Sequence, residues 1–119
     1  MQSIVSVDDR GRIADRLVPR TIGWGPGTRL RARAVRTLVA GLESTMLVIC
    51  ADPTGILRVT GLGHLRITAP LRRWCQLHSG ARVLLTADLA QGQVVVVPPA
   101  TLDQLLSDMW ASVSEVTAS

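Results

Sequence analysis

The sequence of 119 residues has the length of one ordinary domain, or of two small units that share a core. Hydrophobic residues make up 47% of it, which excludes a disordered chain, and no run of eighteen apolar residues offers a membrane span. The N-terminus lacks the basic and apolar regions of a secretory signal, so we expect a cytoplasmic protein without a membrane partner.

The positive charge is concentrated in the first 99 residues. All thirteen basic residues are arginines, and none lies beyond Arg82. Against six carboxylates they leave residues 1–99 with a charge of +7, whereas residues 100–119 carry −3. A basic body favours a polyanionic partner, although a solvated surface in an arginine-rich proteome would give the same composition.

The first element in chain order is a predicted strand over residues 4–7, which leads through a glycine turn into a second short strand. A polar helical turn follows. The segment then ends in a hairpin with strands over 28–35 and 45–51 and a long loop over 36–44. The glycine-rich residues 23–27 are interpreted as the turn before this hairpin, because they neither follow a strand nor begin a helix, as a phosphate-binding loop does.

The same order of elements recurs at an offset of 52 to 53 positions. The matched positions are Gly11-Arg12 with Gly63-His64, Arg20 with Arg73, and Gly27 with Gly80. The second copy has a strand over 56–60 and a hairpin with strands 82–87 and 93–97. One copy is too small to form a core, and residues 52–55 are typical of a tight turn, so we expect two interlocked copies, 1–53 and 54–99, in one pseudo-twofold barrel.

Residues 100–119 change to the pattern of an amphipathic helix of about three turns, with Thr101 as its N-cap. Its apolar face consists of residues at helical spacing: Leu102, Leu105, Leu106, Met109, Trp110 and Val113. We favour packing of this face on the chain's own barrel or on a sister subunit, and the alternative is binding of another protein. Burial of Trp110 would indicate the first arrangement and its exposure the second.

The segment from Val59 to Val83 resembles the AbrB/MazE/SpoVT consensus, which runs as Gly-Arg, an apolar strand, Ile-Pro, a Leu-Arg basic helical turn and a Gly-Asp turn. The first copy carries the opening of that consensus in residues 7–13. Its Asp8-Asp9-Arg10-Gly11-Arg12 also resembles the motif of MraZ proteins, which we rank second. The second copy departs from the consensus at His64 and Thr68. The resemblance covers residues 4–99 and implies a mainly β fold: a swapped-hairpin barrel of two tandem repeats, with short helical turns and a C-terminal helix.

The resemblance implies a nucleoid-associated transcriptional regulator that binds duplex DNA as a dimer or higher homo-oligomer, without a cofactor or catalytic residues. The DNA-binding residues implied by position are Arg10, Arg12, Arg20, His64, Arg72 and Arg73, to which we add Arg16 and Arg66 from the same segments. Guanidinium groups suit this role because they bind phosphates and guanine edges bidentately. The alternating arginines of residues 29–33 are expected to be exposed to solvent instead.

Two other functions remain open. One is an antitoxin-like module whose C-terminal helix binds a toxin protein while the barrel binds its own promoter. The other is an assembly module that no longer binds DNA, for which the degraded centre of the first copy leaves room. The absence of Phe and Tyr disfavours binding of single-stranded nucleic acid.

The cysteines are interpreted as buried apolar residues and not as a disulfide. Cys75 and His78 have a spacing that suits zinc, and Cys50 and His64 would complete four ligands. Because no second close pair of ligands exists, we predict no metal site. No arrangement of residues typical of a catalytic site stands out, so we expect a protein that is not an enzyme.

Overall fold

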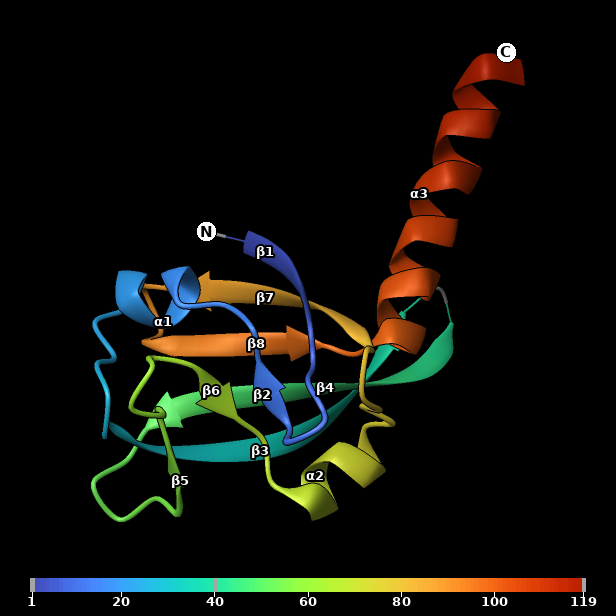
Figure 1. Ribbon diagram of the computed structural model, residues 1–119. Coiled ribbons are helices and arrows are strands. Elements are labelled where there is room, and N and C mark those ends of the chain that lie inside the picture. The colour runs from blue at the N-terminus through green and yellow to red at the C-terminus, as the bar shows by residue number, and fades with distance from the viewer. Residues whose placement is uncertain (1, 40, 119) are drawn as a thin grey trace.

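A curled antiparallel sheet of six strands forms most of the molecule. The computed structural model describes residues 2–39 and 41–118, and their side chains except those of Val39, Asp108 and residues 111–118. The sheet has the order β1-β7-β8-β4-β3-β5 and curls into half a barrel (Figure 1). Its strands are β1 (Gln2–Ser6), β3 (Arg29–Val39), β4 (Leu42–Ala51), β5 (Leu57–Arg58), β7 (Arg82–Asp88) and β8 (Gln93–Val97).

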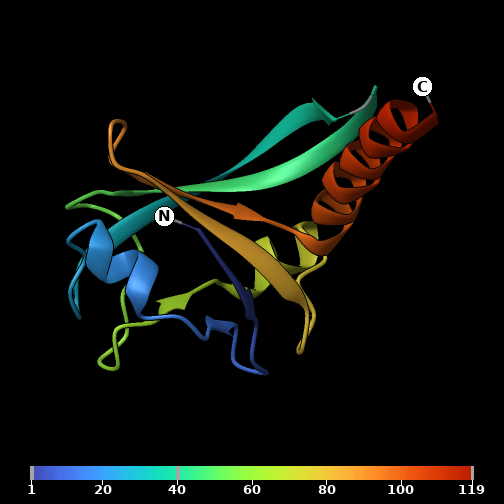
Figure 2. The same ribbon diagram turned by 90° about the horizontal axis from the view of Figure 1, so that it is seen from above.

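A second, two-stranded sheet lies on the hollow side of this half-barrel (Figures 1 and 2). It consists of β2 (Arg12–Ile13) and β6 (Leu65–Arg66), which pair antiparallel. Two short helices, α1 (Leu17–Thr21) and α2 (Ala69–Trp74), follow these strands, and a long helix, α3 (Pro99–Ala118), ends the chain. The expectation of a mainly β protein with a C-terminal helix is therefore confirmed.

The two halves of the chain, residues 1–53 and 54–99, form matching backbone contacts. The two edge strands of the large sheet are β1 and β5, the first strand of each half, and each pairs with a strand of the other half. The Val7 N–H donates to the Ala81 carbonyl at 2.9 Å, and the Val59 N–H donates to the Thr28 carbonyl at 3.0 Å. The matched positions of the sequence thus occupy matched positions in the fold.

The same correspondence extends through the turns that precede the hairpins. The Trp24 N–H donates to the Pro19 carbonyl at 2.8 Å, and the Leu77 N–H donates to the Arg72 carbonyl at 2.8 Å. Both Trp24 and Leu77 are buried in the core. Residues 23–27 therefore form the turn that the sequence predicts, equivalent to residues 76–80.

The core lies between the large sheet and the β2–β6 ribbon. Strand alternation places one face of each strand inward. Ile13 and Leu65 from the ribbon meet Leu47, Ile49 and other apolar side chains from both halves of the sheet in one buried cluster. Because neither half encloses this cluster alone, the ribbon is held in a fixed position by packing from both halves.

The first hairpin differs from the prediction. A loop was expected over residues 36–44, but β3 continues to Val39 and β4 begins at Leu42, so the hairpin extends beyond the equivalent end of β7 and β8. Cross-strand pairs maintain the register: Arg36 faces Thr45 and Leu38 faces Glu43. β-Branched residues favour strand conformation, and side chains that face each other across the two strands stabilise the pairing. The exposed Leu38 and Leu42 lie in this extension.

The C-terminal helix is longer than the predicted three turns and begins earlier. It runs from Pro99 to Ala118, so Thr101 lies inside its first turn and is not the N-cap. Proline suits the start of a helix because it has no N–H to satisfy there. The Thr101 hydroxyl instead donates to the Thr45 carbonyl at 2.9 Å and fixes the helix against β4.

Among the described side chains of α3, only those at its beginning pack on the body of the molecule. Thr101 is buried and Leu102 half-buried, whereas Leu105 and Leu106 are 40% and 41% exposed and Trp110 is 67% exposed. Met109 is exposed as well, and the side chain of Val113 lies outside the described residues. Of the two arrangements that we favoured, packing on the chain's own body covers only Thr101 and part of Leu102 among these side chains. The exposed part of the apolar face is therefore available to a sister subunit or to another protein.

Candidate nucleic-acid interface

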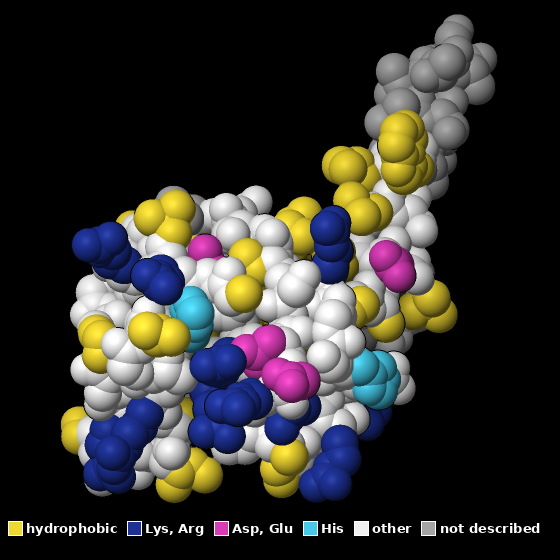
Figure 3. Space-filling view, viewed as in Figure 1, with side chains coloured by type: hydrophobic (Ala, Val, Ile, Leu, Met, Phe, Trp, Pro, Cys, Tyr) yellow, Lys and Arg dark blue, Asp and Glu magenta, His cyan; other side chains and the backbone are white. Residues whose placement is uncertain are grey.

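The β2–β6 ribbon forms the centre of the candidate site. Ile13 pairs with Leu65, its equivalent at an offset of 52, and Arg12 pairs with Arg66 beside it. Because successive side chains on a strand point to opposite faces, burial of Ile13 and Leu65 directs Arg12 and Arg66 outward. Figure 3 shows arginine side chains gathered on this face of the molecule, with acidic side chains among them.

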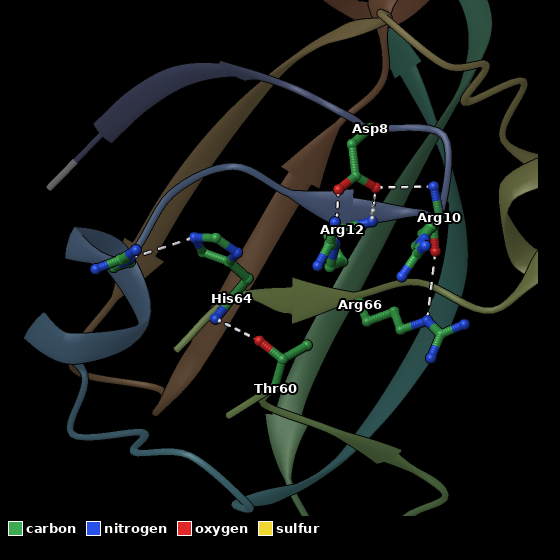
Figure 4. Close-up of polar contacts among 7 residues, drawn as sticks. Asp8, Arg10, Arg12, Thr60, His64 and Arg66 are labelled. Atoms are coloured by element: carbon green, nitrogen blue, oxygen red, sulfur yellow. Dashed lines mark hydrogen bonds and ion pairs between the residues drawn. The ribbon is translucent and has the colours of Figure 1, made fainter. Parts of the chain in front are cut away.

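Asp8 holds the turn of the first half in place. Its Oδ1 accepts the N–H of Arg10 at 2.9 Å and of Arg12 at 2.8 Å, and its Oδ2 accepts Nε of Arg12 at 2.7 Å (Figure 4). Gly11 completes the turn with a φ of 79°, a left-handed conformation that suits glycine. Asp8 therefore orients Arg12 and exposes Arg10 at the tip.

The electrostatics of Asp8 follow from these contacts. Desolvation by the surrounding chain raises the pKa of Asp8, but the two N–H groups and the guanidinium of Arg12 together outweigh it, so the net pKa is lowered. The carboxylate is therefore charged at neutral pH. It partly offsets the repulsion between Arg12 and Arg66, which face each other across the ribbon.

The turn of the second half has the same backbone but different side chains. Thr60 stands where the first half has Asp8, and its Oγ1 accepts the N–H of His64 at 3.1 Å. Gly63 has a φ of 86°. His64 is half-buried, and its Nε2 accepts a long hydrogen bond of 3.4 Å from Nε of Arg16, which precedes α1 (Figure 4). The first and second halves thus meet at His64.

The remaining predicted arginines of the second half lie close to the first turn. Nε of Arg66 donates to the Arg10 carbonyl at 3.3 Å. Arg72 on α2 passes over Gly11 so closely that a Cβ on that glycine would lie 2.6 Å from its Nε. This Nε is buried and has no hydrogen-bond partner among the described residues. Arg73, also on α2, is exposed.

Shallow grooves connect these side chains. Arg10, Arg12 and Arg66 line a groove of about 360 Å³ together with residues 60–62. A second groove, of about 330 Å³, runs beside Arg16, Arg20 and Trp24 and shares Gly61 and Leu62 with the first. A third, of about 270 Å³, lies between Arg72, Arg73 and His78. The first two grooves adjoin each other, His64 joins the second through Arg16, and Arg72 joins the first through its contact with Gly11. We call the eight predicted residues the basic band: Arg10, Arg12, Arg16, Arg20, His64, Arg66, Arg72 and Arg73.

Most of the basic band is free to bind an anion. Among the described side chains, the ion pairs are Asp8–Arg12, Arg31–Asp52 and Arg36–Glu43. Only the first of these lies in the band. Apart from Arg12, the band can therefore offer guanidinium groups to phosphates or to base edges without first breaking an ion pair among the described side chains.

Arg58 is a further candidate that sequence reasoning missed. It lines a groove of about 630 Å³ together with Arg66 and Arg72 and with the buried Leu57 and Ile67. Alternation from the buried Leu57 and Val59 would have indicated an outward Arg58. The proximity of Arg58 to Arg66 and Arg72 depends on the long-range packing of β5, β6 and α2, which no local pattern reports.

The arginines of β3 are exposed, as the sequence predicts. Arg29, Arg31 and Arg33 alternate with the buried Leu30 and the half-buried Ala32. Arg31 lies 3.8 Å from Asp52. These arginines point away from the core face of the sheet, and Arg29 is the cross-strand partner of Arg58.

The described residues contain no group of three or more His, Cys, Asp or Glu side chains that could hold a metal ion. Both cysteines are free; Cys75 is buried and Cys50 half-buried. Burial raises the pKa of the Cys75 thiol, which makes it a poor nucleophile. No helix in the described ranges is both long and apolar enough to cross a membrane.

Comparison with known proteins yields no match among protein-family models, curated proteins or solved structures.

Proposed function

We propose that the chain is a transcriptional regulator that binds duplex DNA through the basic band. The observation that carries this proposal is the antiparallel β2–β6 pairing, which sets the Gly11 and Gly63 turns at the two ends of one exposed ribbon. Two turns in an approximately twofold arrangement, with arginines around both, suit the two antiparallel strands of a duplex. The charge of +7 on residues 1–99 supports association with phosphates.

We also propose that the fold is the tandem form of the AbrB-type swapped-hairpin barrel. Support comes from the strand pairing: β1 of the first half joins the β7–β8 hairpin, and β5 of the second half joins the β3–β4 hairpin. The equivalent hydrogen bonds of Gly80 to Val7 at 2.7 Å and of Gly27 to Val59 at 2.9 Å support it further.

The experiment is a titration of a labelled random-sequence duplex with the full chain at several salt concentrations. We expect affinity to fall steeply with salt, because bound phosphates release counterions. Arg72→Ala with Arg73→Ala should weaken binding about tenfold or more at low salt and reduce the salt slope by about 2.

The matched control is Arg31→Ala with Arg33→Ala. It removes the same charge from the outer face of β3 and should leave most of the affinity intact. Equal losses from both double variants would show that only net charge matters. A wild-type chain that binds no duplex at low salt would defeat the proposal.

A second candidate function is that of an antitoxin-like module that binds a partner protein through α3. The observation that favours it is the exposure of Leu105, Leu106, Met109 and Trp110 on one side of the helix. Exposed apolar surface of this kind marks interaction sites. The two candidates are compatible, since the basic band and the exposed part of α3 are formed by different residues.

A further inference from the structure

The matched positions of the two halves carry different side chains at the centre of the basic band. At an offset of 52, Arg12 corresponds to His64 and Arg10 to Leu62. The backbone around them is nevertheless equivalent: the Asp8 N–H donates to the Arg12 carbonyl at 2.9 Å, and the Thr60 N–H donates to the His64 carbonyl at 2.8 Å. Equivalent backbone therefore presents different chemistry at the two turns.

The groups that hold these side chains differ as well. Asp8 accepts Nε of Arg12 at 2.7 Å, which orients its guanidinium, whereas the neutral Thr60 contacts only the backbone of His64. The ring of His64 instead accepts Nε of Arg16 at 3.4 Å. The first turn thus presents an oriented cation, and the second presents an imidazole beside the exposed Leu62.

Further arginines accumulate at the first turn. Arg66 donates to the carbonyl of Arg10, and Arg72 lies against Gly11. The positions equivalent to Arg66 and Arg72 are Ala14 and Pro19, neither of which carries charge. One end of the approximate twofold face is therefore rich in guanidinium groups, and the other holds an apolar side chain, a histidine and the arginines near Trp24.

We propose that the chain recognises a non-palindromic duplex site and binds it in one orientation. This inference rests on the proposed DNA binding. Arg10 and Arg12 would read guanine, whose O6 and N7 accept a bidentate guanidinium, and Leu62 with His64 would read a half-site in which a thymine methyl offers apolar contact. A pair of identical subunits presents identical side chains at both half-sites and therefore reads an inverted repeat. The two halves of this chain present different side chains, so the two half-sites that they read should differ.

The test is selection of duplexes from a random library by the full chain, scored on sites occupied by one chain each. We expect an asymmetric motif with guanine confined to one half. Replacing those guanines one at a time with 7-deazaguanine, which lacks the N7 acceptor, should weaken binding about fivefold or more. The same replacement at guanines placed in the other half should change affinity less than twofold.

A reciprocal variant sharpens the test. Thr60→Asp, Leu62→Arg and His64→Arg together give the second turn the side chains of the first, so the selected motif should gain guanine in its second half, although Arg66 and Arg72 still have no charged equivalents. A palindromic motif within the site occupied by one wild-type chain, or binding without any enriched motif, overturns the inference and leaves DNA binding intact. Absence of binding at low salt overturns the proposed function and the inference together. The 7-deazaguanine series uses only the wild-type chain, so it stands even if the variant fails to fold.

Discussion

At the scale of the residue, Asp8 has the most contacts in the candidate site. It accepts two backbone N–H groups and one guanidinium. The sequence identified Asp8 only as part of a motif, because a carboxylate two and four residues from its partners is equally compatible with a solvated turn. Only the left-handed Gly11, which the Gly-Arg motif predicts, bends the chain so that these groups converge.

The lowered pKa of Asp8 gives a pH prediction. A carboxyl whose folded pKa lies below its ordinary value of 3.8 stabilises the fold fully above about pH 4, and this contribution is lost as pH falls through the lowered pKa. We expect Asp8→Asn to lower the free energy of unfolding at pH 7 and to flatten its decline below about pH 4. Urea unfolding at several pH values measures this. Asp9→Asn, at an exposed neighbour, serves as control, and equal flattening in both variants would contradict the role of Asp8.

At the scale of the element, the repeat made most of the fold predictable. Strands, glycine turns and the pairing of the two halves followed from the 52- to 53-residue offset, because equivalent sequences that cannot fold alone must bury their apolar faces together. The extended first hairpin was missed because polar residues such as Arg36 and Ser44 suggested a loop. Cross-strand pairing stabilises such residues in strands, and single-sequence patterns do not report it.

The turn that joins the halves provides the second prediction. A Cβ at Gly55 would overlap the carbonyl oxygen of Leu30, so the turn has no room for a side chain where it meets β3. We expect Gly55→Ala to lower the free energy of unfolding by about 2 kcal/mol or more. Gly61 has open space around its Cβ position, and Gly61→Ala should change stability by less than about 0.5 kcal/mol. Chemical denaturation compares them, and a neutral Gly55→Ala would disprove close packing of this turn.

At the scale of the whole molecule, α3 leaves an apolar face without a partner inside the chain. We expect full-length chains to associate through it, because Trp110 and its neighbours bury apolar area only in a complex. Sedimentation velocity should show a dimer or higher oligomer for the wild-type chain and a monomer for Trp110→Lys. Leu89→Lys, at an exposed leucine in the β7–β8 turn, should leave the association unchanged.

The same experiment separates the two candidate occupants of α3. A wild-type chain that is monomeric, yet co-purifies from native lysate with a stoichiometric small protein that Trp110→Lys loses, would support the antitoxin-like function. A monomeric wild-type chain that co-purifies with no such protein would contradict both self-association through α3 and binding of a partner protein. The sequence could identify the apolar face from its helical spacing, but it could not show that only the first turns of the helix rest on the barrel.

The short turn over residues 52–55 joins the two halves covalently, which matters at low protein concentration. A barrel assembled from two separate subunits dissociates on dilution and can exchange its halves with related proteins. Here a covalent connection fixes the effective concentration of one half beside the other, so the two halves stay paired at any cellular abundance. Neither half has to remain compatible with an identical copy of itself, and each is free to accumulate its own substitutions.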